Sequence, residues 1–121
     1  MKATAYKTLS IGKNKNKYNA KKTTVDGIVF DSIIEGNRYC ELKLLQRVGQ
    51  ISDLKWQVPF VLFEKSEHGR KLVYKADFTY MQNGQLVVED TKSKATKTQV
   101  YKLKKRILAE KYGIVIKEVF G

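Results

Sequence analysis

The sequence has 121 residues, of which 42% are hydrophobic and 30% charged, a composition typical of one globular domain. Its 24 lysines and arginines against 12 acids give a formal net charge of +12, which favours a polyanionic partner. No apolar run reaches the roughly 18 residues of a membrane span, no secretory leader follows Met1, and the single Cys40 excludes an internal disulfide, so a cytoplasmic protein is expected.

The first 22 residues are expected to form a flexible basic arm, followed by one folded domain at 23–121. The arm contains seven lysines, has no acid before Asp26 and shows no apolar periodicity. It either contacts nucleic acid, through Lys13, Lys15 and Lys17, or is a solvated tail. An anionic membrane is the alternative partner, but the basic stretches form no amphipathic helix with an apolar side, which favours nucleic acid.

The remaining chain predicts an α/β fold with a mixed sheet. Asp26-Gly27 and Asn83-Gly84 favour two-residue hairpin turns, Ser32 and Gly49 are typical of a helix start and stop, and Pro59 indicates an edge strand or a bulge. The expected elements in chain order are a hairpin at 23–30, a helix at 32–48, a strand at 51–64, a turn at 67–70, strands at 72–81 and 86–91, a helix at 97–112 closed by Gly113, and a strand at 114–120.

The second hairpin brings carboxylates together. If Asn83 and Gly84 form its loop, Asp77 lies opposite Asp90 and Lys75 lies opposite Lys92, and the side-chain period of two puts Lys92 on the face of Asp90. Opposed carboxylates need compensation, from a divalent cation or from a ladder of Asp–Lys ion pairs on a solvated face. The apolar run at 86–88 suggests a strand covered on both faces and so favours a functional site at its end.

A third carboxylate could come from the first helix. Glu35 lies three residues after Ser32, which is also the spacing of a structural capping box. A helical wheel places Glu35 at the margin of the apolar arc and Glu41 nearer its middle, so the pattern alone leaves both open. Cys40, in the same helix, is expected to fill the core.

The second helix is strongly basic, with Glu110 as its only acid. Beside a carboxylate cluster this indicates a surface that follows phosphates rather than a merely solvated face. One cysteine and one histidine cannot form a structural zinc site, and His68 falls in a turn. The lysines expected to contact DNA here are Lys94, Lys97, Lys102 and Lys105, and the expected core contacts are Tyr101, Leu103, Ile107 and Leu108.

Several segments resemble the PD-(D/E)XK nuclease superfamily. The match is carried by Asp77 in YKADFTY and by Asp90-Thr91-Lys92 in VVEDTK, after the helix segment FDSIIEGNRY and the segment GQISDLKWQVPF. It covers about residues 25–120, and Ala76 replaces the proline before Asp77. The helix segment and the segment after it look like those of small phage-encoded members related to junction-resolving endonuclease I and to transposon-end-cleaving nucleases. The resemblance implies a restriction-endonuclease-like mixed sheet flanked by two helices.

The resemblance also implies roles. Asp77 and Asp90 would bind Mg²⁺, for which Mn²⁺ could substitute, with the Thr91 carbonyl and Glu35 as further ligands. On this ground Glu35 is preferred to Glu41. Lys92 would position or activate the attacking water and stabilise charge on the phosphorane, and Gln57 lies where related enzymes keep a polar contact.

The implied activity is that of a metal-dependent DNA endonuclease, acting on branched DNA such as Holliday junctions during phage recombination or packaging. Two symmetric nicks need two active sites, so a homodimer is expected. The alternatives are a non-catalytic DNA-binding protein and a nuclease subunit that needs a partner. A pure binder gains nothing from opposed carboxylates facing a polyanion.

Overall fold

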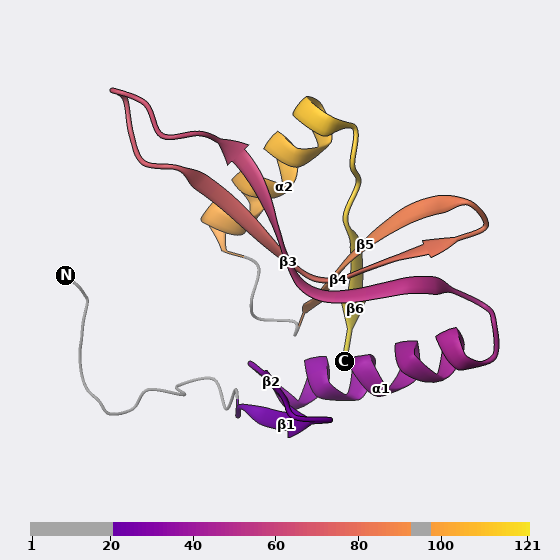
Figure 1. The fold of residues 1–121 in the computed structure, drawn as a ribbon. Coiled ribbons are helices and arrows are strands. Elements are labelled where there is room, and N and C mark those ends of the chain that lie inside the picture. Colours follow the sequence, from indigo (N-terminus) through magenta and orange to yellow (C-terminus); the bar gives the residue numbers. More distant parts are fainter. Residues whose placement is uncertain (1–20, 93–97) are drawn as a thin grey trace. The chain divides into compact units, whose positions relative to one another are not determined.

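A computed structural model describes residues 21–92 and 98–121 (Figure 1). The chain divides into two compact units, Met1–Gly36 and Asn37–Gly121, and each is considered by itself. No helix of the described residues is long and apolar enough to cross a membrane. The elements are β1 (Thr23–Val25), β2 (Ile28–Phe30), α1 (Ile33–Arg47), β3 (Ser52–Phe63), β4 (Leu72–Gln82), β5 (Gln85–Lys92), α2 (Gln99–Tyr112) and β6 (Lys117–Phe120).

The basic arm expected at 1–22 lies outside the described residues, apart from its last two positions. Its flexibility, and the DNA contacts of Lys13, Lys15 and Lys17, therefore stay predictions. At the end of this segment, Lys22 forms an exposed ion pair of 3.2 Å with Asp31.

The first unit contains the predicted hairpin and the start of α1. Asp26 and Gly27 have φ values of 53° and 77°, as a type I′ turn requires, and they join β1 to β2. Gly36 permits a close approach of α1 to β1, because a Cβ at this position would lie 2.6 Å from Thr23 Cγ2.

Helix α1 begins and ends as predicted. The Ser32 hydroxyl accepts a hydrogen bond of 3.1 Å from the Glu35 amide, as an N-cap does, and Gly49 follows the helix with a φ of 84°. The expectation that Cys40 fills the core is wrong, because its side chain is exposed. In this part of α1 the buried positions are Tyr39 and Leu42, three residues apart, and Cys40 falls between them on the solvent side.

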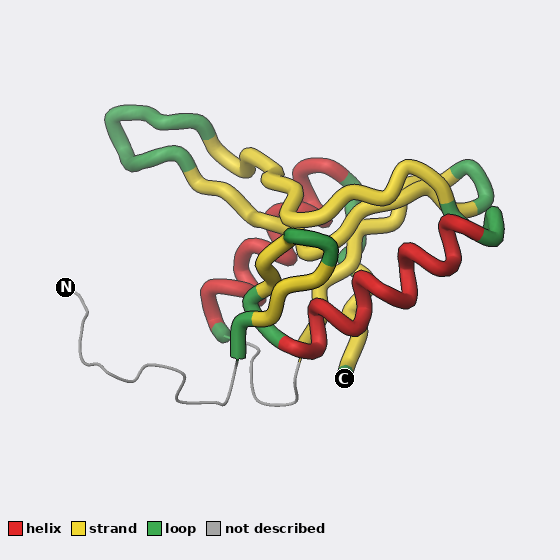
Figure 2. The backbone as a smooth tube through the Cα atoms, turned by 60° about the horizontal axis from the view of Figure 1, so that its bottom comes forward, coloured by secondary structure: helices red, strands yellow, loops and turns green. Residues whose placement is uncertain are grey.

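A mixed four-stranded sheet of order β3-β4-β5-β6 forms the second unit, so the α/β fold with a mixed sheet and two helices is confirmed. The first two pairings are antiparallel and the last is parallel. β3 is an edge strand, as Pro59 indicated, and its register shifts fall elsewhere, between Ser52 and Lys55 and between Val61 and Phe63. β3 and β4 extend into a long hairpin, whose loop projects away from the sheet (Figure 2).

The β4–β5 hairpin has the predicted register. Asn83 and Gly84 form its loop, with φ values of 54° and 75°, and the ladder runs from the Gln82–Gln85 pair to the Phe78–Glu89 pair. Asp77 and Asp90 occupy the next position. The predicted pair of Lys75 with Lys92 is wrong, because the β4–β5 ladder ends before it reaches this position.

The two helices cover opposite faces of the sheet within the second unit. Val88 packs in the core with α2, whereas its neighbour Glu89 binds Arg38 of α1, and adjacent residues of a strand point to opposite faces. α2 is closed by Gly113, as predicted, and its N-cap is Thr98, which was not predicted. The core on the α2 side consists of Leu62, Tyr74, Ala76, Val88, Tyr101, Leu108 and Ile116.

Two apolar positions differ from expectation because they face solvent. Leu103 of α2 is 58% exposed, so it is not a core contact, whereas Ile107 is partly buried against the core. Leu86 is 51% exposed beside the hairpin turn, so the run at 86–88 is not covered on both faces. Burial on β5 begins only at Val88 and continues through Glu89 and Asp90.

The alternation of side chains along β4 shifts by one near Asp77. Ala76 packs with Val88 on the α2 face, whereas Tyr80 binds Glu89 on the opposite face, although a separation of four residues should keep both on one face. On β3, the residue opposite Asp77 is Gln57, which has a φ of 54° that non-glycine residues seldom adopt in a strand. The sheet is therefore irregular at the position of the predicted site.

Candidate functional site

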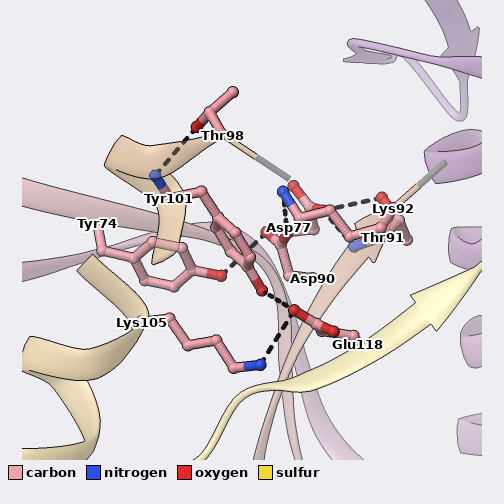
Figure 3. A network of polar contacts seen from close by, with 9 residues as sticks. All are labelled: Tyr74, Asp77, Asp90, Thr91, Lys92, Thr98, Tyr101, Lys105 and Glu118. Carbon is pink, nitrogen blue, oxygen red and sulfur yellow. Dashed lines mark hydrogen bonds and ion pairs between the residues drawn. The ribbon is translucent and has the colours of Figure 1, made fainter. Parts of the chain in front are cut away.

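Asp90 is buried at the end of β5 and has two polar neighbours. The Tyr74 hydroxyl donates a hydrogen bond of 3.0 Å to Oδ1, and Lys92 Nζ lies 2.7 Å from Oδ2 (Figure 3). Oδ2 is shielded from solvent and accepts no hydrogen bond of regular geometry, so its contact with Lys92 is an ion pair alone. The hydrogen-bonding capacity of this oxygen is therefore only partly used.

Asp77 is held by one residue of the neighbouring strand. The Thr91 amide and the Thr91 hydroxyl donate to the same oxygen, Oδ2, at 2.7 and 2.8 Å. The backbone ladder of β4 and β5 ends two residues earlier on β5, at Glu89, so the Asp77 side chain continues the connection between the strands. The predicted proximity of Asp77 and Asp90 is confirmed, although the pair lies just beyond the end of the ladder.

The carboxylates of Asp77 and Asp90 are close enough to affect each other's ionisation. Burial, followed by the negative charge of Asp90, raises the pKa of Asp77 from 3.8 to about 6, although the hydrogen bonds from Thr91 and the charge of Lys92 act to lower it. A single lysine therefore does not compensate both acids. A buried acid whose pKa is shifted by burial and by a specific charged neighbour is a candidate for a functional site.

Lys92 is enclosed between an acid and an aromatic ring. Its ammonium lies 2.7 Å from Asp90 Oδ2 and 3.6 Å from the ring centroid of Tyr101. The side chains of Lys92 and Asp90 are 13% and 7% exposed. The alternative of an Asp–Lys ladder on a solvated face is therefore wrong, because this ion pair is buried.

Three residues near the site were not predicted to belong to it. Tyr74 and Tyr101 donate hydroxyl hydrogen bonds to Asp90 and Glu118, and burial raises the pKa of both tyrosines above the ordinary value of 10, so both hydroxyls stay protonated donors. Glu118 of β6 is directly opposite Asp90. A strand at 114–120 was expected, but the sequence carries no signal for its parallel register.

A second polar group lies on the other face of β5. Glu89 is fully buried and accepts hydrogen bonds of 2.9 and 2.6 Å from the guanidinium of Arg38, together with one from the Tyr80 hydroxyl, and Lys117 lies 3.9 Å away. The hydrogen bond to Glu89 raises the pKa of Arg38 further above its ordinary value. This group holds β5 on the sheet face that carries α1, whereas Asp90 lies on the face that carries α2.

Comparison with known proteins places the sequence in a family. Residues 15–119 match the family model described as "Protein of unknown function (DUF1064)". The chain belongs to the DUF1064 family. No curated protein and no solved structure matches it significantly.

Glu35 belongs to the first unit of the DUF1064 chain, whereas Asp77, Asp90 and Lys92 belong to the second. Its side chain is buried, while that of Glu41 is 64% exposed and paired with Arg38 at 2.9 Å. This contrast favours Glu35 over Glu41 as an inward-facing helix carboxylate. A role for Glu35 beside the two aspartates stays a prediction.

The acidic pair of the DUF1064 chain suits a divalent cation of the Mg²⁺ type. Asp90 Oδ2 accepts no regular hydrogen bond, and burial followed by the negative charge of Asp90 raises the pKa of Asp77. Among residues 21–92 and 98–121, no three His, Cys, Asp or Glu side chains are grouped to hold a metal. Mg²⁺ commonly binds to one or two carboxylates, with waters and substrate phosphate as the other ligands, so two aspartates are sufficient donors.

The predicted DNA-contacting lysines of the second helix region divide into three cases. Lys102 is exposed on α2. Lys105 is partly exposed and forms an ion pair of 3.1 Å with Glu118. Lys94 and Lys97 lie outside the described residues, so their contacts stay predictions.

Proposed function

We propose that this DUF1064 protein is a metal-dependent DNA endonuclease that hydrolyses phosphodiester bonds. The observation that carries the proposal is the buried group of Asp77, Asp90 and Lys92, in which two acids are incompletely neutralised by one lysine. This group occupies the positions that correspond to the PD-(D/E)XK signature, on a mixed sheet with helices on both faces. The net charge of +12 supplies affinity for a polyanion.

The residues divide the chemistry between them. Asp77 and Asp90 would hold Mg²⁺, with Glu35 and the Thr91 carbonyl as further proposed ligands. When bound, Mg²⁺ polarises a phosphoryl oxygen and lowers the pKa of water. Thr91 fixes the orientation of the Asp77 carboxylate through its two hydrogen bonds.

Lys92 contributes a positive charge beside the scissile phosphate. Its ammonium carries three donors and forms an ion pair with Asp90, and its donors would serve a phosphoryl oxygen or the attacking water. In the reaction, the water oxygen forms a bond to phosphorus and the bond to the leaving oxygen breaks. Charge on the equatorial oxygens grows in the transition state, and a preorganised ammonium stabilises it.

The proposed substrate is branched DNA, and the proposed assembly is a homodimer that nicks two strands of a junction. The test is cleavage of a labelled four-way junction and of a matched linear duplex with Mg²⁺ or Mn²⁺. Wild type is compared with Asp90→Asn, which keeps the shape of the ligand and removes its charge, and with Lys92→Met. Glu110→Gln is the matched control, because Glu110 is an exposed acid of α2 that pairs with Arg106.

We expect wild type and the control to cut, while Asp90→Asn and Lys92→Met bind DNA without cutting at a comparable rate. Loss of the general acid–base or electrostatic contribution of one group typically lowers a rate by about 10²–10⁴-fold. If wild type binds but does not cut with either metal, the protein is a DNA-binding module or a subunit that needs a partner, and the nuclease proposal fails.

A further inference from the structure

Glu118 lies one strand away from Asp90. The two residues are directly opposite in the parallel ladder of β5 and β6, and neighbouring strands are about 4.8 Å apart. The Glu118 side chain is only 12% exposed, and it accepts hydrogen bonds of 2.7 Å from the Tyr101 hydroxyl and 3.1 Å from Lys105 Nζ (Figure 3). A lysine of α2 is thereby held at a defined place beside the acidic pair.

A shallow pocket of about 280 Å³ opens at this place. Lys105 neutralises Glu118, the only acid of the lining, and Arg106 is paired with Glu110. Lys102 lies three residues before Lys105 on the same face of α2 and makes no ion pair with the described residues. The lining consists of Tyr101, Lys102, Lys105, Arg106, Ala109 and Glu118, and it therefore carries excess positive charge.

Tyr101 joins this pocket to the candidate site. One face of its ring supports Lys92 Nζ at 3.6 Å, and its hydroxyl binds Glu118. The Lys105 ammonium has three donors, and Glu118 takes one, so Lys105 can bind an anion without leaving Glu118. The pocket and Lys92 are therefore connected through a single side chain, that of Tyr101.

From these contacts we infer that Lys105, oriented by Glu118 and Tyr101 and assisted by Lys102, is a second phosphate subsite. It takes the backbone phosphodiester group adjacent to the scissile one. By binding this group, Lys105 fixes the register of the DNA strand relative to Asp77 and Asp90. The inference rests on the proposed function for its substrate, but binding alone can test it.

The test measures DNA binding in EDTA, with a short labelled duplex, at several salt concentrations. Wild type is compared with Lys105→Gln and with Lys104→Gln, which removes the same charge from the same helix at a residue outside the pocket lining. For Lys105→Gln we expect several-fold weaker binding and a salt slope smaller by about 1, because one phosphate contact is lost. Lys104→Gln should change both quantities less.

A purely structural role for Lys105 predicts a different pattern. Lys105→Gln also leaves the Glu118 carboxylate without its lysine, and this could weaken binding through misfolding or repulsion. Lys105→Gln/Glu118→Gln removes both charges and should restore the melting temperature, while binding stays weaker than for Glu118→Gln alone. If the double variant binds as Glu118→Gln does, or if Lys105→Gln binds as wild type does, the subsite is refuted.

The same preparations separate this inference from the nuclease proposal. Cleavage by wild type with Mg²⁺ or Mn²⁺ tests the proposed function, and the binding series in EDTA tests the subsite. Cutting together with an unchanged Lys105→Gln binding curve overturns only the subsite. An absence of cutting together with the expected Lys105→Gln defect overturns only the nuclease, and the subsite stands as part of a DNA-binding surface.

Discussion

Thr91 and Asp77 are joined by two hydrogen bonds to a single carboxylate oxygen, one from the Thr91 amide and one from its hydroxyl. The contact lies where the backbone ladder between β4 and β5 has ended. The Asp77 carboxylate takes the place of a backbone acceptor for the Thr91 amide, so the backbone of β5 determines its orientation. Because two donors of Thr91 hold the same oxygen, the Asp77 carboxylate has little rotational freedom.

Asp77→Asn should stabilise the protein at neutral pH without divalent metal. Because the folded-state pKa of Asp77 is raised to about 6, from 3.8, the carboxylate costs stability once it ionises. The cost is absent below about pH 4 and grows as the pH rises to about 6, and it amounts to at most about 3 kcal/mol. Denaturant unfolding from pH 4 to pH 8 should show the two proteins converging at low pH. A constant difference over this range would contradict the prediction.

Mg²⁺ should raise the melting temperature of wild type at pH 7.5 and lose this effect below about pH 6. The cation binds the ionised form of Asp77, so protons compete with it near the raised pKa. Asp90→Asn should show no Mg²⁺ effect at either pH, while the Glu110→Gln control should behave as wild type. Differential scanning fluorimetry with and without EDTA measures both. An equal shift at pH 5 and at pH 7.5 would refute this dependence.

Thr91→Val should move the pH dependence of the Mg²⁺ effect upward. Valine has nearly the shape of threonine but lacks the hydroxyl that donates to Asp77 Oδ2. That hydrogen bond lowers the pKa of Asp77, so its removal raises the pKa above about 6 and metal binding needs a higher pH. The melting-temperature series gives the midpoint directly. A midpoint unchanged from wild type would show that the hydroxyl does not stabilise the ionised acid.

Arg38→Ala should destabilise the fold by about 3–5 kcal/mol, because it leaves the fully buried Glu89 carboxylate without its guanidinium. The control is Arg106→Ala, which removes an arginine from an exposed pair with Glu110 and should cause no measurable change. Chemical unfolding at pH 7.5 distinguishes them. Similar losses for both variants would mean that burial of the pair does not determine its contribution.

The turns show how much local chemistry can predict. Asn83-Gly84 requires a left-handed backbone at both positions, and this fixed the hairpin register and the proximity of Asp77 and Asp90 correctly. The caps at Ser32, Thr98 and Gly113 have the same local origin, although the sequence indicated only the first and last.

The remainder of the site depends on contacts distant in sequence. Tyr74 reaches Asp90 only because β4 shifts its alternation near Asp77, and a strictly regular strand would have placed Lys75 there instead. Glu118 depends on a parallel register between β5 and β6 that no turn specifies. Leu103 was misplaced because an apolar pattern does not give the width of the covered arc of the helix. Cys40 was misplaced because the general tendency of cysteine to be buried does not say which face of the helix it occupies.

The shift of alternation in β4 also bears on how this sheet folds. Because Tyr74 and Ala76 pack on one face and Tyr80 on the other, one continuous strand contributes to both layers. If the side chains on either face of the sheet lost their packing, part of β4 would become exposed. Unfolding of residues 37–121 should therefore be a single cooperative transition, in which β4 exchanges its amide protons among the slowest of all.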